Sequence, residues 1–127
     1  MKVEIWSDVV CPWCYIGKRR FEAALGRFAH RDDVDVVWRS FELDPAAPAL
    51  RDENNTERLA AKYGMTRQQA VDSQARLTQT GAGEGLTFRF DISKSGNTFN
   101  AHRLLHLAGE RGLRDEVKER LMRAYFS

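Results

Sequence analysis

Both cysteines of this sequence lie in one short stretch, Ser7-Asp8-Val9-Val10-Cys11-Pro12-Trp13-Cys14-Tyr15-Ile16-Gly17-Lys18. Before this stretch, residues 2–6 alternate polar and apolar side chains, which predicts a short strand. Pro12 suits the first turn of a helix, because a backbone N–H at this position would have no helical partner. The cysteine pair is therefore predicted to lie where a strand passes into a helix. Further along that helix, apolar side chains recur at helical spacing at Phe21, Ala24, Leu25 and Phe28.

A second strand is predicted from Val34 to Phe41, a segment rich in valine and aromatic residues. The polar cluster Arg31-Asp32-Asp33 is predicted to end the helix that precedes this strand. The separation of the two strands fits the crossover of a parallel βαβ unit. We therefore assign residues 1–44 to an N-terminal βαβ unit that carries the cysteine motif.

Residues 45–127 have the pattern of a helical region. Asn54 and Thr66 are each followed three residues later by Glu or Gln, which is the capping-box pattern of a helix start. Gly64 and Gly81 stand where C-terminal caps belong. Helices are predicted over residues 56–63, 67–80 and 99–111, and from residue 114 onward.

Two segments between these helices are predicted to be irregular. The run Gly81-Ala82-Gly83-Glu84-Gly85 is predicted to be a flexible loop, and no Lys-Ser or Lys-Thr pair follows it as in a phosphate-binding loop. The alternation of apolar and polar residues that follows predicts a short strand or an extended arm. The apolar members of this alternation are Leu86, Phe88, Phe90 and Ile92.

The chain has 127 residues, of which 43% are hydrophobic and 30% are charged, and its net charge is +2. This balance is typical of a single globular domain. The basic cluster Lys18-Arg19-Arg20 falls inside a helical pattern, so we interpret it as a solvated helix face and not as a nucleic-acid-binding patch. No apolar run reaches the roughly 18–20 residues of a membrane-spanning helix, and no secretory signal follows Met1. We therefore expect a cytoplasmic protein without nucleic-acid or membrane partners.

Two cysteines spaced C-x-x-C are typical of a redox-active or metal-binding pair in a reducing compartment. At a helix N-terminus, the N–H groups and the helix dipole stabilise a thiolate, which favours ionisation of Cys11 with the Cys14 thiol as hydrogen-bond donor. Cys11 is therefore the predicted nucleophile, and Cys14, one turn deeper, is the predicted resolving thiol. Pro12 removes one donor from the helix start, and Trp13 offers an apolar surface to a substrate.

Two other interpretations of the cysteine pair are open. A structural zinc site needs four ligands, so Cys11 and Cys14 would need His102 and His106, which are four residues apart on a predicted helix. The pair could also be two inert buried thiols, although proline and tryptophan at a helix start disfavour this. We expect one of the two histidines near the core, the other on the surface, and no bound metal.

The quoted stretch resembles the DsbA-like thioredoxin family. Two further segments share the resemblance: Trp38-Arg39-Ser40-Phe41-Glu42-Leu43 and Asn97-Thr98-Phe99-Asn100-Ala101-His102-Arg103-Leu104. The match is to the FrnE-like branch, which is related to 2-hydroxychromene-2-carboxylate isomerase and to kappa-class glutathione transferase. The resemblance implies an α/β thioredoxin fold interrupted by a helical insertion, here residues 45–127. It also implies disulfide exchange with Cys11 as nucleophile and Cys14 as resolving thiol.

The sequence departs from the family pattern at its end. Family members continue past the helical insertion to a cis-proline loop, two more strands and a final helix. Here the only prolines are Pro12, Pro45 and Pro48, so the C-terminal thioredoxin strands are absent from this chain. A sheet of two strands is marginal in water, and its open edge would be covered by a missing segment or by a second copy in a homodimer.

The sequence thus favours a thiol–disulfide oxidoreductase or isomerase that acts on protein or small-molecule thiols. We expect such an enzyme to need no cofactor, although glutathione would be a suitable redox partner. An alternative is a glutathione-dependent isomerase or transferase, because the related isomerase and transferase bind glutathione and have serine where Cys11 stands. A second alternative is a non-catalytic module that senses redox state or binds zinc.

Overall fold

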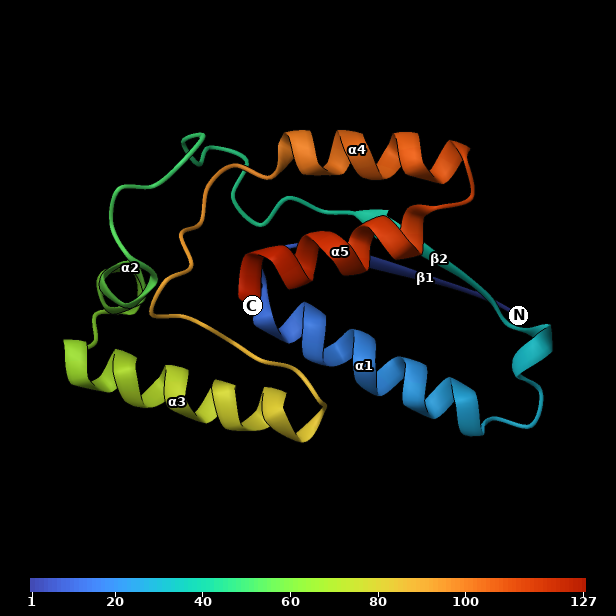
Figure 1. The fold of residues 1–127 in the computed structure, drawn as a ribbon, viewed down its shortest axis with the longest axis horizontal. Helices are drawn as coiled ribbons and strands as arrows, with labels where there is room; N and C mark the ends of the chain where they lie inside the picture. The colour runs from blue at the N-terminus through green and yellow to red at the C-terminus, as the bar shows by residue number, and fades with distance from the viewer.

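The computed structural model describes residues 1–127. The N-terminal part consists of strand β1 (Lys2–Ser7), helix α1 (Pro12–Arg27), a 3₁₀ turn (Arg31–Asp33) and strand β2 (Asp35–Ser40). The remainder is helical (Figure 1), with α2 over Asn55–Tyr63, α3 over Arg67–Gly83, α4 over Phe99–Glu110 and α5 over Arg114–Phe126. The predicted α/β class and the order of elements are confirmed.

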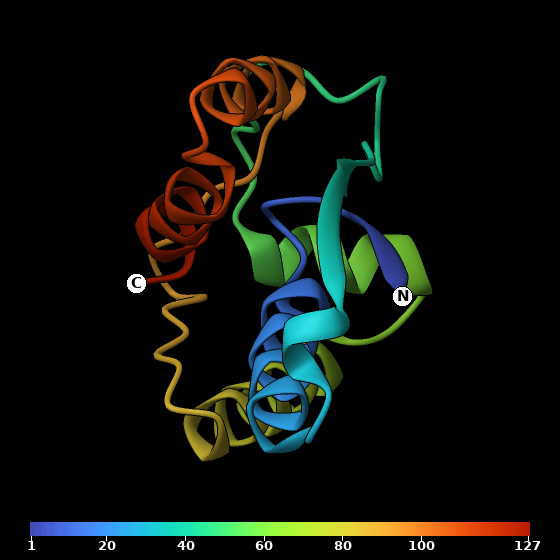
Figure 2. The same cartoon turned by 90° about the vertical axis from the view of Figure 1, so that its right-hand side faces the viewer.

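Strands β1 and β2 pair in parallel, in a register that runs from Lys2 opposite Asp35 to Ser7 opposite Ser40. Helix α1 provides the crossover between them, so the predicted βαβ unit is confirmed (Figure 2). The sheet contains only these two strands, and each therefore has one edge without a strand partner. Such edges expose backbone N–H and C=O groups that can pair with a further strand.

The predicted helix caps at Asn54, Gly64 and Thr66 are confirmed. The Asn54 side chain accepts a hydrogen bond from the backbone N–H of Glu57, and Thr66 forms a complete capping box with Gln69. Gly64 ends α2 in the left-handed conformation, with a φ of 62°, which glycine adopts without steric cost.

Two predicted helix ends are wrong. Helix α1 ends at Arg27 and not at the Arg31–Asp33 cluster, which forms the separate 3₁₀ turn. Helix α3 continues through Gly81 to Gly83, where a flexible loop was expected. The phenyl ring of Phe88 explains the glycine at position 81, because a Cβ there would lie 2.7 Å from the ring.

The core is shared between the βαβ unit and the helices. The short strand or extended arm predicted over residues 86–92 is not formed as such: residues 86–89 belong to no strand and residues 90–92 form a turn. This segment places Phe88 against Phe126 of α5, with ring centroids 4.9 Å apart. The division of the chain near residue 44 stays a prediction. The buried apolar cluster draws on both sides of it, through Val9, Tyr15, Ile16, Leu86, Phe88, Leu105, Met122 and Phe126.

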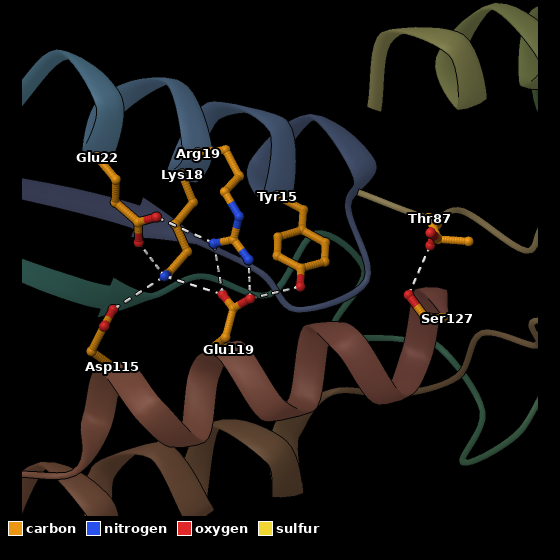
Figure 3. A network of polar contacts seen from close by, with 8 residues as sticks. All are labelled: Tyr15, Lys18, Arg19, Glu22, Thr87, Asp115, Glu119 and Ser127. Carbon is orange, nitrogen blue, oxygen red and sulfur yellow. Dashed lines mark hydrogen bonds and ion pairs between the residues drawn. The ribbon is translucent and has the colours of Figure 1, made fainter. Parts of the chain in front are cut away.

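Helices α1 and α5 are also joined by a polar network (Figure 3). Lys18 is buried and forms ion pairs with Glu22, with Asp115 at 3.3 Å and with Glu119 at 3.2 Å. Glu119 also pairs with Arg19. The interpretation of Lys18 as part of a solvated helix face is therefore wrong, because α5 covers this side of α1. In both views α5 lies between α4 and α1 (Figures 1 and 2).

None of the helices combines the length and the apolar character that crossing a membrane requires.

Candidate active site

The cysteine pair lies at the junction of β1 and α1, as predicted. Cys11 is the residue before the helix, with extended backbone angles, and Pro12 is in the first turn. The carbonyl of Cys11 accepts the backbone N–H groups of Cys14 and Tyr15, at 3.1 and 3.3 Å. Both cysteines are free thiols and are half-buried. This geometry brings the two sulfurs together at the N-terminal end of the helix.

The two thiols titrate as a coupled pair. The Cys11 thiol donates a hydrogen bond to the Cys14 sulfur, and this is the main reason why the pKa of Cys14 is lowered to about 6. The backbone N–H of Asp8, the polar side chain of Ser7 and the charge of Lys118 lower the pKa of Cys14 further. The pKa of Cys11 is raised, first by its hydrogen bond to Cys14 and then by burial.

The prediction that Cys11 is the sulfur that ionises stays a prediction, because the two interacting thiols titrate as one unit. That expectation rested on the helix N-terminus, whose N–H groups at Trp13 and Cys14 favour a thiolate on Cys11, and on the Cys14 thiol as a hydrogen-bond donor. The structure adds the polar groups of Ser7 and Asp8, which lower the pKa of Cys14. Because the two sulfurs exchange one proton, the pair titrates as a unit and either sulfur can hold the negative charge.

The two sulfurs face different cavities. Cys11, Pro12 and Trp13 line a cavity of about 1180 Å³ that extends to α2 and α3. Cys14 lines a smaller cavity of about 300 Å³, whose wall includes Trp13 and Trp38. Cys11 is thus the sulfur that a molecule in the large cavity would meet, and Trp13 lies between the two cavities. The Trp13 side chain is 58% exposed, so its apolar surface is available to a ligand.

Asp8 fixes the segment that leads into the motif, a role for which its place in the sequence gave no signal. Its buried carboxylate accepts hydrogen bonds from the backbone N–H groups of Val9 and Leu43, at 2.8 and 3.0 Å. Thr98 donates to it at 3.2 Å, and His102 contacts it at 3.0 Å. Burial alone would raise the pKa of Asp8, but these hydrogen bonds outweigh burial and lower it.

The proposed zinc ligands do not come together. His102 is buried and contacts Asp8, whereas His106 is exposed on the surface of α4. The expectation of one histidine near the core and one on the surface is confirmed. No group of three or more His, Cys, Asp or Glu side chains is arranged to hold a metal ion, so Cys11 and Cys14 have no further ligand beside them.

Comparisons with known proteins agree with the family resemblance found in the sequence. Residues 2–127 match the DsbA-like thioredoxin domain. The chain belongs to this family. A crystal structure of a probable DsbA oxidoreductase from Streptomyces coelicolor superposes on 99% of the chain with a TM-score of 0.94 and 49% sequence identity. The DsbA-like thioredoxin fold predicted from the sequence is therefore confirmed.

Two relatives of the DsbA-like chain are considerably longer than it is. The chain spans 54% of the Streptomyces coelicolor structure. The uncharacterized protein YwbO of Bacillus subtilis is 40% identical over 53 residues, which are 42% of this chain and 24% of YwbO.

Proposed function

We propose that the protein is a thiol–disulfide oxidoreductase of the FrnE-like branch, with Cys11 and Cys14 as its catalytic residues. The observation that carries this proposal is the hydrogen-bonded pair of free thiols, one with its pKa lowered to about 6, at the start of α1. A thiolate is the nucleophile in disulfide exchange, so a pair that ionises below neutral pH is prepared for this chemistry.

The positions of the sulfurs suggest how the reduced pair would act. Transfer of the shared proton from Cys11 to Cys14 leaves a thiolate on Cys11, which lines the large cavity. That thiolate attacks a substrate disulfide, forming a Cys11–substrate disulfide and releasing a substrate thiolate. Cys14 then attacks the Cys11 sulfur, closes the Cys11–Cys14 disulfide and releases the second substrate thiolate.

The reverse reaction is favoured by the same electrostatics. When a substrate thiolate attacks Cys11 of the oxidised pair, Cys14 is the leaving group, and a thiol of low pKa leaves faster. Ser7, Asp8 and Lys118 already stabilise the thiolate that forms there. Stabilisation of the reduced pair makes the disulfide a better oxidant. The site is therefore suited to oxidise thiols.

We further propose that the substrate is a thiol or disulfide of a protein or small molecule, held in the large cavity beside Pro12 and Trp13. The reaction would use no cofactor, with glutathione as a redox partner, in the cytoplasm. Nucleic acids and membranes are not proposed as partners. A homodimer is proposed to cover the open edge of the sheet, and size-exclusion chromatography would test it.

The test is a glutathione redox titration, read by alkylation of free thiols and intact mass. We expect a reversible two-electron transition between about −270 and −120 mV, the values of thioredoxin and DsbA. Cys11→Ser should abolish exchange, and Cys14→Ser should accumulate a Cys11–substrate disulfide. Absence of a reversible transition would contradict the proposal. Glutathione binding that survives Cys14→Ser without exchange activity would instead favour a glutathione-dependent isomerase or transferase.

A further inference from the structure

Arg58 of α2 is a half-buried cation in the wall of the large cavity, and it has no anionic partner. Its guanidinium forms no ion pair and no hydrogen bond, and its Nε atom is buried. Glu57 is its neighbour in the sequence, but consecutive residues of a helix do not face each other. Arg51, the other arginine of this wall, is paired with Asp44 and Glu53. Burial of an unpaired charge costs free energy, so the free guanidinium of Arg58 requires an explanation.

A second donor in the cavity wall has no partner either. Ser95 is only 4% exposed, and its buried hydroxyl makes no hydrogen bond. Asn55, which precedes Arg58 by one turn on the same face of α2, donates to the carbonyl and the hydroxyl of Ser93 at 2.9 and 2.7 Å. The segment that carries Ser95 is therefore held against the face of α2 that carries Arg58 (Figure 1).

The same segment leads to the cysteine motif. Thr98, three residues after Ser95, donates a hydrogen bond of 3.2 Å to the carboxylate of Asp8. Asp8 in turn precedes Cys11 by three residues. Cys11, Arg58 and Ser95 all line the cavity of about 1180 Å³. A molecule that meets the Cys11 sulfur in this cavity can therefore also reach the two donors that have no partner.

The chemistry of these two groups indicates what they would bind. Both are hydrogen-bond donors and one of them is cationic, so the complementary ligand group is an anionic acceptor. A guanidinium with free N–H groups matches the geometry of a carboxylate, which accepts two parallel hydrogen bonds from it. Disulfides and thiols that carry a carboxylate combine this group with a sulfur that Cys11 can exchange.

We propose that Arg58 and Ser95 form a carboxylate-binding subsite, which selects carboxylate-bearing disulfides and thiols for exchange at Cys11. This inference rests on the exchange activity proposed above. The Cys11 thiolate attacks one sulfur of such a disulfide, and the sulfur–sulfur bond of the substrate breaks. Cys14 then closes the Cys11–Cys14 disulfide. Two electrons pass from the cysteine pair to the substrate, and the two thiols that are released take up the two protons that the cysteines lose.

The test compares two disulfides of similar size: dithiodipropionate, which carries two carboxylates, and bis(hydroxyethyl) disulfide, which is neutral. Each is mixed with the reduced protein, and formation of the Cys11–Cys14 disulfide is followed by alkylation of free thiols and intact mass. The neutral compound is the internal reference, so the ratio of the two rates measures the preference for a carboxylate. In Arg58→Met we expect this ratio to fall about fivefold. The fold should survive, because methionine keeps an unbranched apolar stem.

Three further variants separate the subsite from other effects of charge. Arg120→Met makes the same change at an exposed position of α5, outside the cavity wall, and should leave both rates unchanged. Arg58→Lys keeps the charge and should retain part of the preference. Ser95→Ala removes the second donor and should lower the ratio about twofold.

An unchanged ratio in a folded Arg58→Met variant would overturn the inference. Failure of the proposed activity would look different, because bis(hydroxyethyl) disulfide would not oxidise the wild-type pair. Calorimetry of dithiodipropionate binding to Cys11→Ser then decides the subsite without any exchange. We expect saturable binding that weakens about fivefold when Arg58→Met is added. An affinity that does not depend on Arg58 would refute the subsite.

Discussion

At the scale of single residues, the coupled titration of Cys11 and Cys14 has a measurable consequence. Because the pKa of Cys14 is lowered to about 6, the reduced pair should react with iodoacetamide at a rate that rises with pH around that value. A typical free cysteine would show this rise near pH ~8.5. The measurement is the alkylation rate against pH, followed by intact mass.

Cys11→Ala provides the control for this prediction. It removes the thiol that donates to Cys14, the largest cause of the lowered pKa, so the alkylation profile should move to higher pH. An unchanged profile would mean that Ser7, Asp8 and Lys118 stabilise the thiolate without help from Cys11.

The C-x-x-C spacing, with Pro12 and a strand–helix junction, made the cysteines predictable. Asp8 and Lys118 gave no comparable signal. Acidic and basic side chains are common on surfaces, and nothing in the spacing of residues 8, 14 and 118 reveals that they meet. The lowered pKa of Cys14 could not be predicted for the same reason, because its causes include Lys118 of α5, more than 100 positions away.

At the scale of elements, the end of α3 shows packing overriding local preference. Alanine is favoured over glycine inside a helix by about 0.5–1 kcal/mol. At Gly81, however, a Cβ would lie 2.7 Å from the buried Phe88 ring. Gly81→Ala should therefore lower the free energy of unfolding by about 1–2 kcal/mol, since the cost of overpacking exceeds the gain in propensity. Urea denaturation measures this change.

Gly83→Ala is the matched control, because Gly83 lies in the same helix and a Cβ there meets no atom within 4 Å. This substitution should leave stability unchanged or raise it by up to about 1 kcal/mol. Equal effects at both positions would show that Phe88 does not require the glycine. The flexible loop predicted for this run was wrong because sequence reasoning treated glycine as a breaker, without the aromatic side chain that packs over it.

At the scale of the whole molecule, Asp8 joins the βαβ unit to the helical part. Its carboxylate binds the backbone of Leu43 after β2, as well as Thr98 and His102 at the start of α4. Asp8→Asn replaces one accepting oxygen by an NH₂ group that faces donors. We expect it to lower the free energy of unfolding by about 2–4 kcal/mol near neutral pH. Asp52→Asn, at an exposed position, should have little effect.

The pH dependence of this difference has a definite sign. The pKa of Asp8 is lowered in the folded protein from its usual value of 3.8. The stabilisation by ionised Asp8 is therefore fully present above that value, and it is lost as the pH falls through the lower folded pKa. The gap between wild type and Asp8→Asn in denaturant unfolding should accordingly close in acid. A gap that is independent of pH would contradict a role for the ionised carboxylate.

The sequence by itself determined the βαβ unit, the helical region and the cysteine pair. These features depend on hydrophobic period, capping residues and a short motif, which involve neighbours along the chain. The tertiary structure alone decided that Lys18 and Lys118 are buried, that Asp8 joins distant segments and that Cys14 carries the lowered pKa. Each of these follows from α4 and α5 packing against the start of α1, and the energies of burial and charge depend on such long-range contacts.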